Sequence, residues 1–242
     1  MAQPLPSNRD EAWRYSDIAA LESLWPLPSP ENIMLPAGGE FTHTILQDGG
    51  AVHQIKLTIG KGARAAIHAL NIGGDYGRIE LDVTLHEGAD FKLGAVQIAG
   101  GEQNQEIITT VTHAEPNATS QQIVRSVLAD TATGTYLGKV AVARDAQKTD
   151  SEQDIKAMLL NRSATANAKP ELEIFADDVL CAHGATVGEL DNQALFYLAS
   201  RGLPEKAAKR IMLQAFVAGA FDGAEAQDAL TERALAKLAE LV

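Results

Sequence analysis

Two side chains of this sequence could bind a soft or borderline metal together, Cys181 and His183, and they lie two positions apart. Thiolate and imidazole are both good ligands for such metals. A closed zinc site needs four ligands and an iron–sulfur cluster is typically held by four thiolates, whereas Cys181 is the only cysteine among 242 residues. A metal or cluster here must therefore be shared with another chain. The alternative is structural: Cys181 is then a small buried hydrophobe and His183 a hydrogen-bonded turn residue.

The pair lies where a strand-rich region meets a helical tail. Leu172, Ile174 and Val179 alternate in the way that is typical of strands, and Gly184 and Gly188 predict a turn before a helical pattern begins. Asp177 and Asp178 are adjacent on the predicted strand and so point to opposite faces, which favours a solvated strand end over a cation site.

Upstream of this pair, from residue 43 to residue 178, apolar residues recur at every second position, which predicts strands. Turns follow at intervals of 26, 28, 29 and 25 residues, at Gly62–Ala63, Gly88–Ala89, Pro116–Asn117, Asp145–Ala146 and Pro170–Glu171. Short strands in a loose repeat with no helix between them predict a mainly β fold, a right-handed parallel β-helix. An antiparallel sandwich is the competing interpretation, although it would not produce similar coils in register. The open ends of a solenoid expose unpaired strand edges, so we expect dimerisation through the core.

The last fifty residues predict three helices. Asp191 is a plausible N-cap of the first, Pro204 suits the start of the second, and Asp222 with Glu225 forms a capping-box pattern before the third. The second helix carries one apolar stripe at Ala208, Ile211, Met212, Ala215, Phe216 and Gly219. A second stripe at Leu213, Val217, Ala220 and Phe221 predicts a partner-binding surface, unless the helix is packed between the core and the third helix.

Composition excludes several classes of function. The net charge of −12 and the lack of a basic stripe argue against nucleic acid as a partner. No apolar run approaches the roughly 20 residues that cross a bilayer, and the N-terminus lacks a signal-peptide pattern, so we expect a cytoplasmic protein without a membrane partner. Phosphate-binding loops and hydrolase motifs are also missing, which predicts that this chain is not itself an enzyme.

Several ordered motifs resemble the SufB/SufD family of iron–sulfur cluster assembly proteins. The matching residues are 169–174 (KPELEI), 176–179 (ADDV), 181–188 (CAHGATVG), 195–202 (LFYLASRG) and, near the N-terminus, 9–17 (RDEAWRYSD). SufB-like sequences have an acidic residue after the histidine and more cysteines, so Gly184 and the single cysteine favour the SufD branch. Within the N-terminal motif, Trp13 is expected to pack against the core.

The resemblance implies a β-helix core in a non-catalytic scaffold subunit. The implied partners are the SufC ATPase, docked by the C-terminal helices, and either SufB or a second SufD copy. It further implies a transient iron–sulfur cluster shared with SufB. From the residue types we hypothesise that His183 is a ligand offered across the subunit interface, with Cys181 as a second ligand or sulfur carrier. Flavin could bind such a complex, but nothing in this sequence indicates it.

The expected domains are an N-terminal helix and proline-rich linker (1–36), the β-helix core (37–189) and a helical subdomain (190–242). Members of the family are usually longer, so we expect coils to be missing between the N-terminal helix and His43. A β-helix enzyme acting on polysaccharide is the alternative function, which would need a groove of carboxylates and aromatic residues. Aromatic residues make up only 5% of the chain, so few platforms for sugars are expected.

Overall fold

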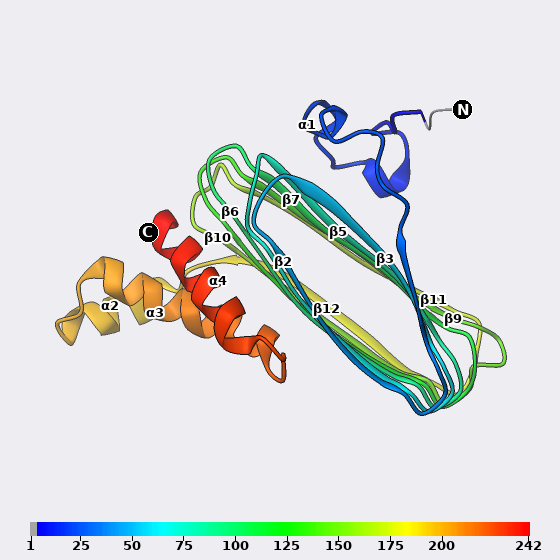
Figure 1. The fold of residues 1–242 in the computed structure, drawn as a ribbon. Helices are drawn as coiled ribbons and strands as arrows, with labels where there is room; N and C mark the ends of the chain where they lie inside the picture. Colours follow the sequence, from blue (N-terminus) through cyan, green and yellow to red (C-terminus); the bar gives the residue numbers. More distant parts are fainter. Residues whose placement is uncertain (1–3) are drawn as a thin grey trace.

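The period-two segments form strands that alternate between two parallel sheets. The computed structural model describes residues 4–242 and shows a flattened β-helix in which each coil contributes one strand to each sheet (Figure 1). Sheet A contains, in spatial order, β1 (Glu31–Leu35), β3 (Ala51–Ile59), β5 (Tyr76–Leu85), β7 (Asn104–His113), β9 (Thr133–Val142) and β11 (Thr165–Ile174). Sheet B contains β2 (Glu40–Gln47), β4 (Arg64–Asn71), β6 (Asp90–Ala99), β8 (Thr119–Leu128), β10 (Asp150–Leu159) and β12 (Leu180–Glu189). The predicted parallel β-helix is confirmed.

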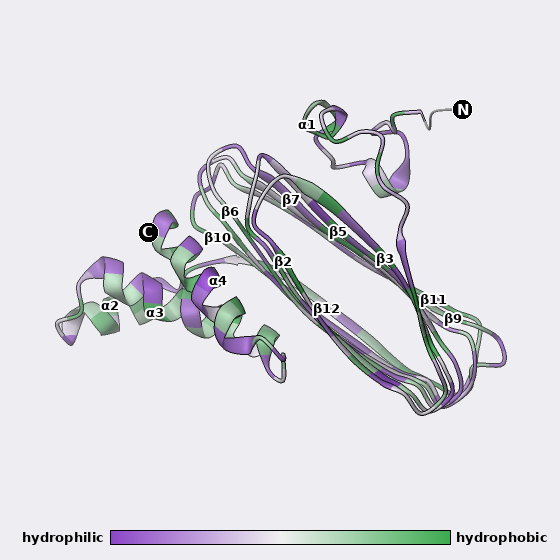
Figure 2. Cartoon of the chain, in the orientation of Figure 1, coloured by the Kyte–Doolittle hydropathy of each residue, from purple (hydrophilic) through white to green (hydrophobic). Residues whose placement is uncertain are grey.

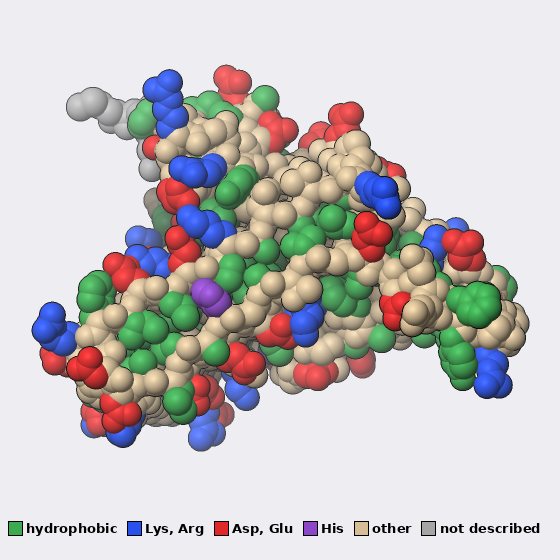
Figure 3. Space-filling view, turned by 180° about the vertical axis from the view of Figure 1, so that it is seen from behind, with side chains coloured by type: hydrophobic (Ala, Val, Ile, Leu, Met, Phe, Trp, Pro, Cys, Tyr) green, Lys and Arg blue, Asp and Glu red, His purple; other side chains and the backbone are tan. Residues whose placement is uncertain are grey.

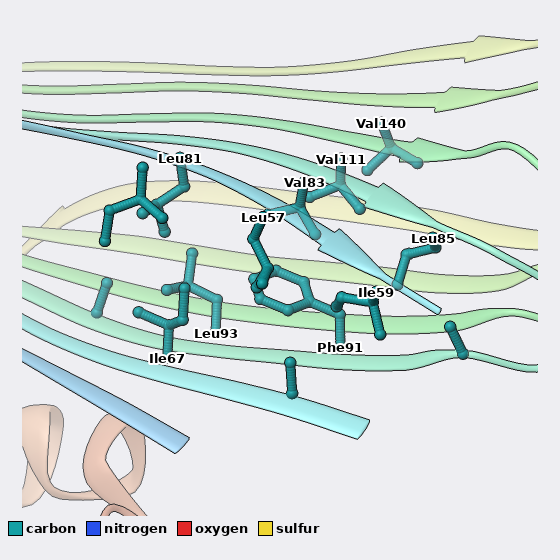
Figure 4. Packing of buried hydrophobic residues seen from close by; sticks show 14 of the residues in the cluster. Leu57, Ile59, Ile67, Leu81, Val83, Leu85, Phe91, Leu93, Val111 and Val140 are labelled. Carbon is teal, nitrogen blue, oxygen red and sulfur yellow. The ribbon is translucent and has the colours of Figure 1, made fainter. Parts of the chain in front are cut away.

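Apolar side chains stack in columns between the two sheets. Leu57 pairs in register with Val83, Val83 with Val111, and Val111 with Val140, and all four are buried (Figure 4). Burying each such side chain contributes on the order of 1.5–3 kcal/mol. The repeat seen in the sequence is therefore the physical repeat of the coils.

The last coil differs from the expectation. Val140 continues in register to Leu172, so Pro170 lies inside β11 and does not form a turn. A proline is tolerated there because β11 is the edge strand of sheet A. Gly184 and Gly188, which predict a turn, also lie within a strand, β12. The turn falls earlier, and it contains Asp178, which pairs with Lys148 of the preceding coil.

The N-terminal segment packs on the outer face of sheet A through a buried arginine (Figure 1). It comprises η1 (Glu11–Trp13) and α1 (Ile18–Glu22), and β1 follows within the range for which the sequence predicts an extended linker. The Arg78 guanidinium lies 3.9 Å from the centroid of the Trp13 ring and donates to Glu106 Oε2 at 2.7 Å. Ser16 Oγ donates to the same carboxylate oxygen at 3.0 Å, and Trp13 packs as the sequence predicts.

The C-terminal helices cover part of the outer face of sheet B (Figure 1). They are α2 (Asn192–Ser200), α3 (Glu205–Ala218), the short η2 (Gly219–Phe221) and α4 (Gln227–Leu241). Asp191 caps α2 as predicted, its Oδ1 accepting from the Gln193 N–H. At the junction, a Cβ on Gly94 would lie 1.8 Å from the Ala220 carbonyl oxygen, so only glycine lets η2 approach β6 this closely. None of the described helices is long and apolar enough to span a membrane.

Two expectations about these helices are wrong. Leu213, Val217 and Phe221 are at most 2% exposed and pack against outward-facing residues of sheet B, so they form no free docking surface. This is the alternative in which α3 lies between the core and α4. Figure 2 shows hydrophobic and hydrophilic residues alternating along both helices. The predicted capping box does not form either, because Gly223 takes a positive φ of 82° and α4 begins only at Gln227.

Candidate functional site

The β-helix ends in an uncovered coil that carries the predicted site. β11 and β12 are the terminal strands of their sheets and have no second neighbour among residues 4–242. Their exposed side chains include large hydrophobics: Ile174 is 39% exposed, Val187 47% and Leu180 72%. We call this region, formed by β11, β12 and the turn between them, the open end. In Figure 3, which views the molecule from behind, hydrophobic side chains and a histidine lie together on this face.

Cys181 and His183 both lie on the inner face of β12. They pair in register with Ser151 and Gln153 of β10, which point into the solenoid and are each 1% exposed. Because alternate residues of a strand share a face, the two potential ligands lie side by side, about 6.6 Å apart along the strand. The structure therefore brings the predicted pair to one face of the terminal strand, at the open end of the solenoid.

Cys181 continues a column of hydrogen-bonded hydroxyl groups. Ser151 Oγ lies 2.9 Å from Ser120 Oγ, which in turn lies 2.9 Å from Nε2 of the buried His113. Cys181 itself is half-buried and packs against the interior core. Burial, and then the negative charge of Asp150, raises the pKa of the Cys181 thiol. The isolated chain thus holds this thiol in its protonated form, which is a poor metal ligand until a cation or partner stabilises the thiolate.

His183 lies above a second polar column. Gln153 Nε2 donates to Tyr136 Oη at 3.1 Å, and Tyr136 Oη donates to Gln122 Oε1 at 3.2 Å. Thr109 Oγ1 also donates to Gln122 Oε1, at 2.9 Å. His183 itself is exposed, and it has no hydrogen-bond partner within the described part of the chain.

Two inner columns of sheet B become polar toward the open end. In sheet B, the column that holds Ser120 begins with Phe41, Ala65 and Phe91, and the column that holds Gln122 passes through Ile67 and Leu93. Buried polar groups cost free energy unless they are hydrogen-bonded, so apolar side chains would serve stability better at these positions. In these two columns the polar side chains lead to Cys181 and His183, whereas the column from Gln47 to Ala157 changes in the opposite direction.

Sequence reasoning missed the residues beneath the pair. Ser151 and Gln153 lie two positions apart, in register with the cysteine and histidine, and they alternate with exposed Asp150 and Glu152. The only signal in the sequence was polar residues at inward positions of a period-two strand.

The pair alone does not complete a metal site. Among the described residues, no group of three or more His, Cys, Asp or Glu side chains is placed to hold a metal ion. Two protein ligands leave the remaining positions of a cluster iron to sulfide or to another chain. The geometry therefore fits a half-site that needs a partner across the open end.

A second exposed apolar surface lies on α2 and α3. Phe196 is 77% exposed, Tyr197 57% and Ile211 49%, and α2 has no buried residue. Ile211 belongs to the first apolar stripe of α3, whereas the second stripe faces the core. The surface that a partner could reach is thus the one opposite to the predicted residues.

Comparisons with known proteins place the chain in a family. Residues 32–216 match the family model described as SUF system FeS cluster assembly, SufBD core domain. A SufBD family protein of Synechocystis is 32% identical over 195 residues, which cover 78% of this chain and 43% of the relative. The iron–sulfur cluster assembly protein SufD of Escherichia coli is 31% identical over 163 residues, covering 67% of this chain and 38% of that protein.

SufD of Bacillus subtilis is 32% identical over 123 residues, covering 51% of this chain and 28% of that protein. This chain therefore spans less than half the length of these relatives. The family match favours a role in cluster assembly over the polysaccharide-active alternative. The chain belongs to the SufBD family of iron–sulfur cluster assembly proteins.

Proposed function

We propose that the chain is a non-catalytic scaffold subunit of a Suf-type assembly complex. Its open end pairs with SufB or with a second SufD-like copy, and its C-terminal helices dock the SufC ATPase. A transient iron–sulfur cluster forms across the open end as the cargo of the complex, with His183 as one ligand and Cys181 as a second ligand or sulfur carrier. In this proposal the hydrolysis of nucleotide belongs to SufC.

One observation carries the proposal: Cys181 and His183 lie together on the uncovered inner face of the terminal strand. Free strand edges and exposed hydrophobic side chains surround them, and natural proteins seldom leave such edges unpaired. A partner that adds strands here would bury the apolar rim and supply the ligands that the half-site lacks.

Docking of an ATPase through the helical subdomain is supported by the exposed aromatic side chains of α2. Phe196 and Tyr197 are large, they stand out from a helix that buries nothing, and aromatic residues are enriched where proteins bind each other. The close contact at Gly94 would transmit a movement of the helices directly to β6.

Replacing His183 by Ala tests the ligand role. In a complex reconstituted with SufB and SufC, we expect His183→Ala to lower the amount of assembled cluster at least about tenfold, because a first ligand matters no less than its supporting partners. Cluster content is measured by absorbance and by iron and sulfide analysis. His53→Ala is the matched control, since His53 is also exposed but lies on β3, toward the opposite end of sheet A. Normal cluster content in His183→Ala would show that the ligand role is wrong.

A further inference from the structure

We propose that Gln153 is a positioning residue for His183. Its side-chain oxygen accepts one ring N–H of the histidine, so that the other ring nitrogen points out of the open end toward the iron of the cluster. The inference rests on the proposed function, because it concerns how the same half-site is prepared for its cargo.

The fold places the two side chains next to each other. Gln153 and His183 are register partners in the β10–β12 ladder and lie on the same face of sheet B. Neighbouring strands are about 4.8 Å apart, so a turn of the exposed His183 ring brings a ring nitrogen within hydrogen-bond reach of the amide below it. No side chain of the described chain lies between them in the ladder, because β12 pairs directly with β10.

The side-chain amide of Gln153 uses its nitrogen in a hydrogen bond and leaves its oxygen without a partner. Its Nε2 donates to Tyr136 Oη, so the oxygen is the end left over. That Oε1 atom is buried and has no hydrogen-bond partner within the described chain. Leaving a buried acceptor unpaired costs about 1–3 kcal/mol, so a donor arriving from the open end would recover this free energy.

The network beneath Gln153 holds the amide in place. Tyr136 Oη accepts from Gln153 Nε2, donates to Gln122 Oε1 and lies 3.0 Å from Thr109 Oγ1. Room for the Tyr136 ring exists because position 138 is glycine: a Cβ on Gly138 would lie 2.1 Å from Tyr136 Oη. Tyr136 is 1% exposed, so bulk solvent does not reach this arrangement.

The chemistry of the two groups is complementary. A neutral imidazole has one N–H donor and one acceptor nitrogen, and a histidine that ligates a metal usually donates its N–H to a carboxylate or carbonyl oxygen. Such a hydrogen bond fixes both the tautomer and the orientation of the ring. Gln153 provides an unpaired carbonyl oxygen as the acceptor, and His183 provides an unpaired ring N–H as the donor.

Three substitutions in the complex paired with SufB test the proposal, with Zn²⁺ as the probe and competition against a chromophoric chelator as the measurement. Gln153→Met removes the acceptor at similar volume and is expected to weaken Zn²⁺ binding about 10- to 100-fold. Gln153→Glu keeps an oxygen acceptor and is expected to restore the affinity to within about threefold of the wild type. Gln97→Met is the matched control, because Gln97 is also buried in sheet B but lies on β6, three strands away from β12.

A crystal structure of the wild-type pair supplies a measurement that needs no variant. We expect a ring nitrogen of His183 within about 3.2 Å of Gln153 Oε1, and a separation above about 4 Å would overturn the inference even if Gln153→Met fails to assemble. Equal Zn²⁺ affinity in Gln153→Met and wild type would also overturn it. Failure of the proposed function looks different: His183→Ala would then leave Zn²⁺ affinity unchanged as well. If His183→Ala weakens binding and Gln153→Met does not, only the positioning role is wrong.

Discussion

One polar side chain inside the solenoid, His113, makes the stability of the fold sensitive to pH. His113 occupies the position that Leu85 holds in the preceding coil and Val142 in the next, so a polar ring replaces an aliphatic side chain in the core. It is fully buried and bonded through Nε2 to Ser120. Burial lowers the pKa of His113 to about 4.

This pKa makes the stability of the chain depend on pH. An unfolded histidine titrates near 6.5, so below that pH the unfolded state takes up a proton that the folded state refuses until about pH 4. Stability is therefore fully present above about pH 6.5, and we expect His113 to remove about 3 kcal/mol of it as the pH falls to 4.

The measurement is the free energy of urea unfolding across this range, in wild type and in His113→Leu. The leucine should fit the column, and the carboxylates contribute equally to both proteins, so the variant should show a shallower loss. Identical pH profiles would mean that His113 is protonated in the folded chain.

At the scale of elements, α3 turns its second apolar stripe to the core and leaves Ile211 of the first stripe exposed to solvent. Leu213 is fully buried between sheet B and α4, whereas Ile211, two residues earlier, is 49% exposed. The two positions allow folding and docking to be separated on one helix.

We expect Ile211→Asp to abolish binding of SufC while changing the free energy of unfolding by no more than about 0.5 kcal/mol. Leu213→Asp, by contrast, buries a charge and should cost about 3 kcal/mol or more. Isothermal calorimetry with SufC and urea unfolding check the pair. Wild-type affinity in Ile211→Asp would remove this face of α3 from the docking surface.

Elements were predictable where pattern and packing agree. The column from Leu57 to Val140 could be predicted because the inward positions of successive coils are apolar. The alternation of apolar and polar residues also predicts the strands themselves. The pattern was misread in the last coil, where Pro170 and Gly184 have the composition of turns but lie in terminal strands. The strands β11 and β12 tolerate proline and glycine because each has one unpaired edge and a partly uncovered face. The position of a strand at the end of a sheet is set by the whole fold, so the local sequence does not predict it.

The two potential ligands of the site could be predicted from the sequence, but the residues that surround them could not. Sequence spacing placed Cys181 and His183 together, but only the register of β10 and β12 shows that Gln153 lies beneath the histidine. Likewise, both stripes of α3 look alike in sequence, and only packing shows that Val217 and Phe221 face the core.

At the scale of the whole molecule, the two ends of the β-helix are not equivalent. Both leave strand edges unpaired in the described chain, but the ligand pair lies only at the end formed by β11 and β12. We expect self-association or pairing with SufB to use this end.

Val187→Lys tests this choice of end, because Val187 lies on the inner face of β12 and a lysine there would have to be buried in a paired complex. The dissociation constant of the complex that the Val187→Lys variant forms with its pairing partner should rise at least about tenfold in sedimentation velocity experiments. Met34→Lys, at an exposed apolar position on β1 at the other end, should pair normally. The reverse result would assign the pairing surface to the N-terminal end.

The buried Arg78 also bears on how the chain is made. Ser16 and Glu106, which meet at this arginine, are 90 residues apart, and the carboxylate belongs to β7 in the fourth coil of the solenoid. During synthesis the segment around Trp13 leaves the ribosome long before its binding site exists. The hydrogen bonds that Ser16 and Arg78 make with Glu106 can therefore form only after β7 has been synthesised.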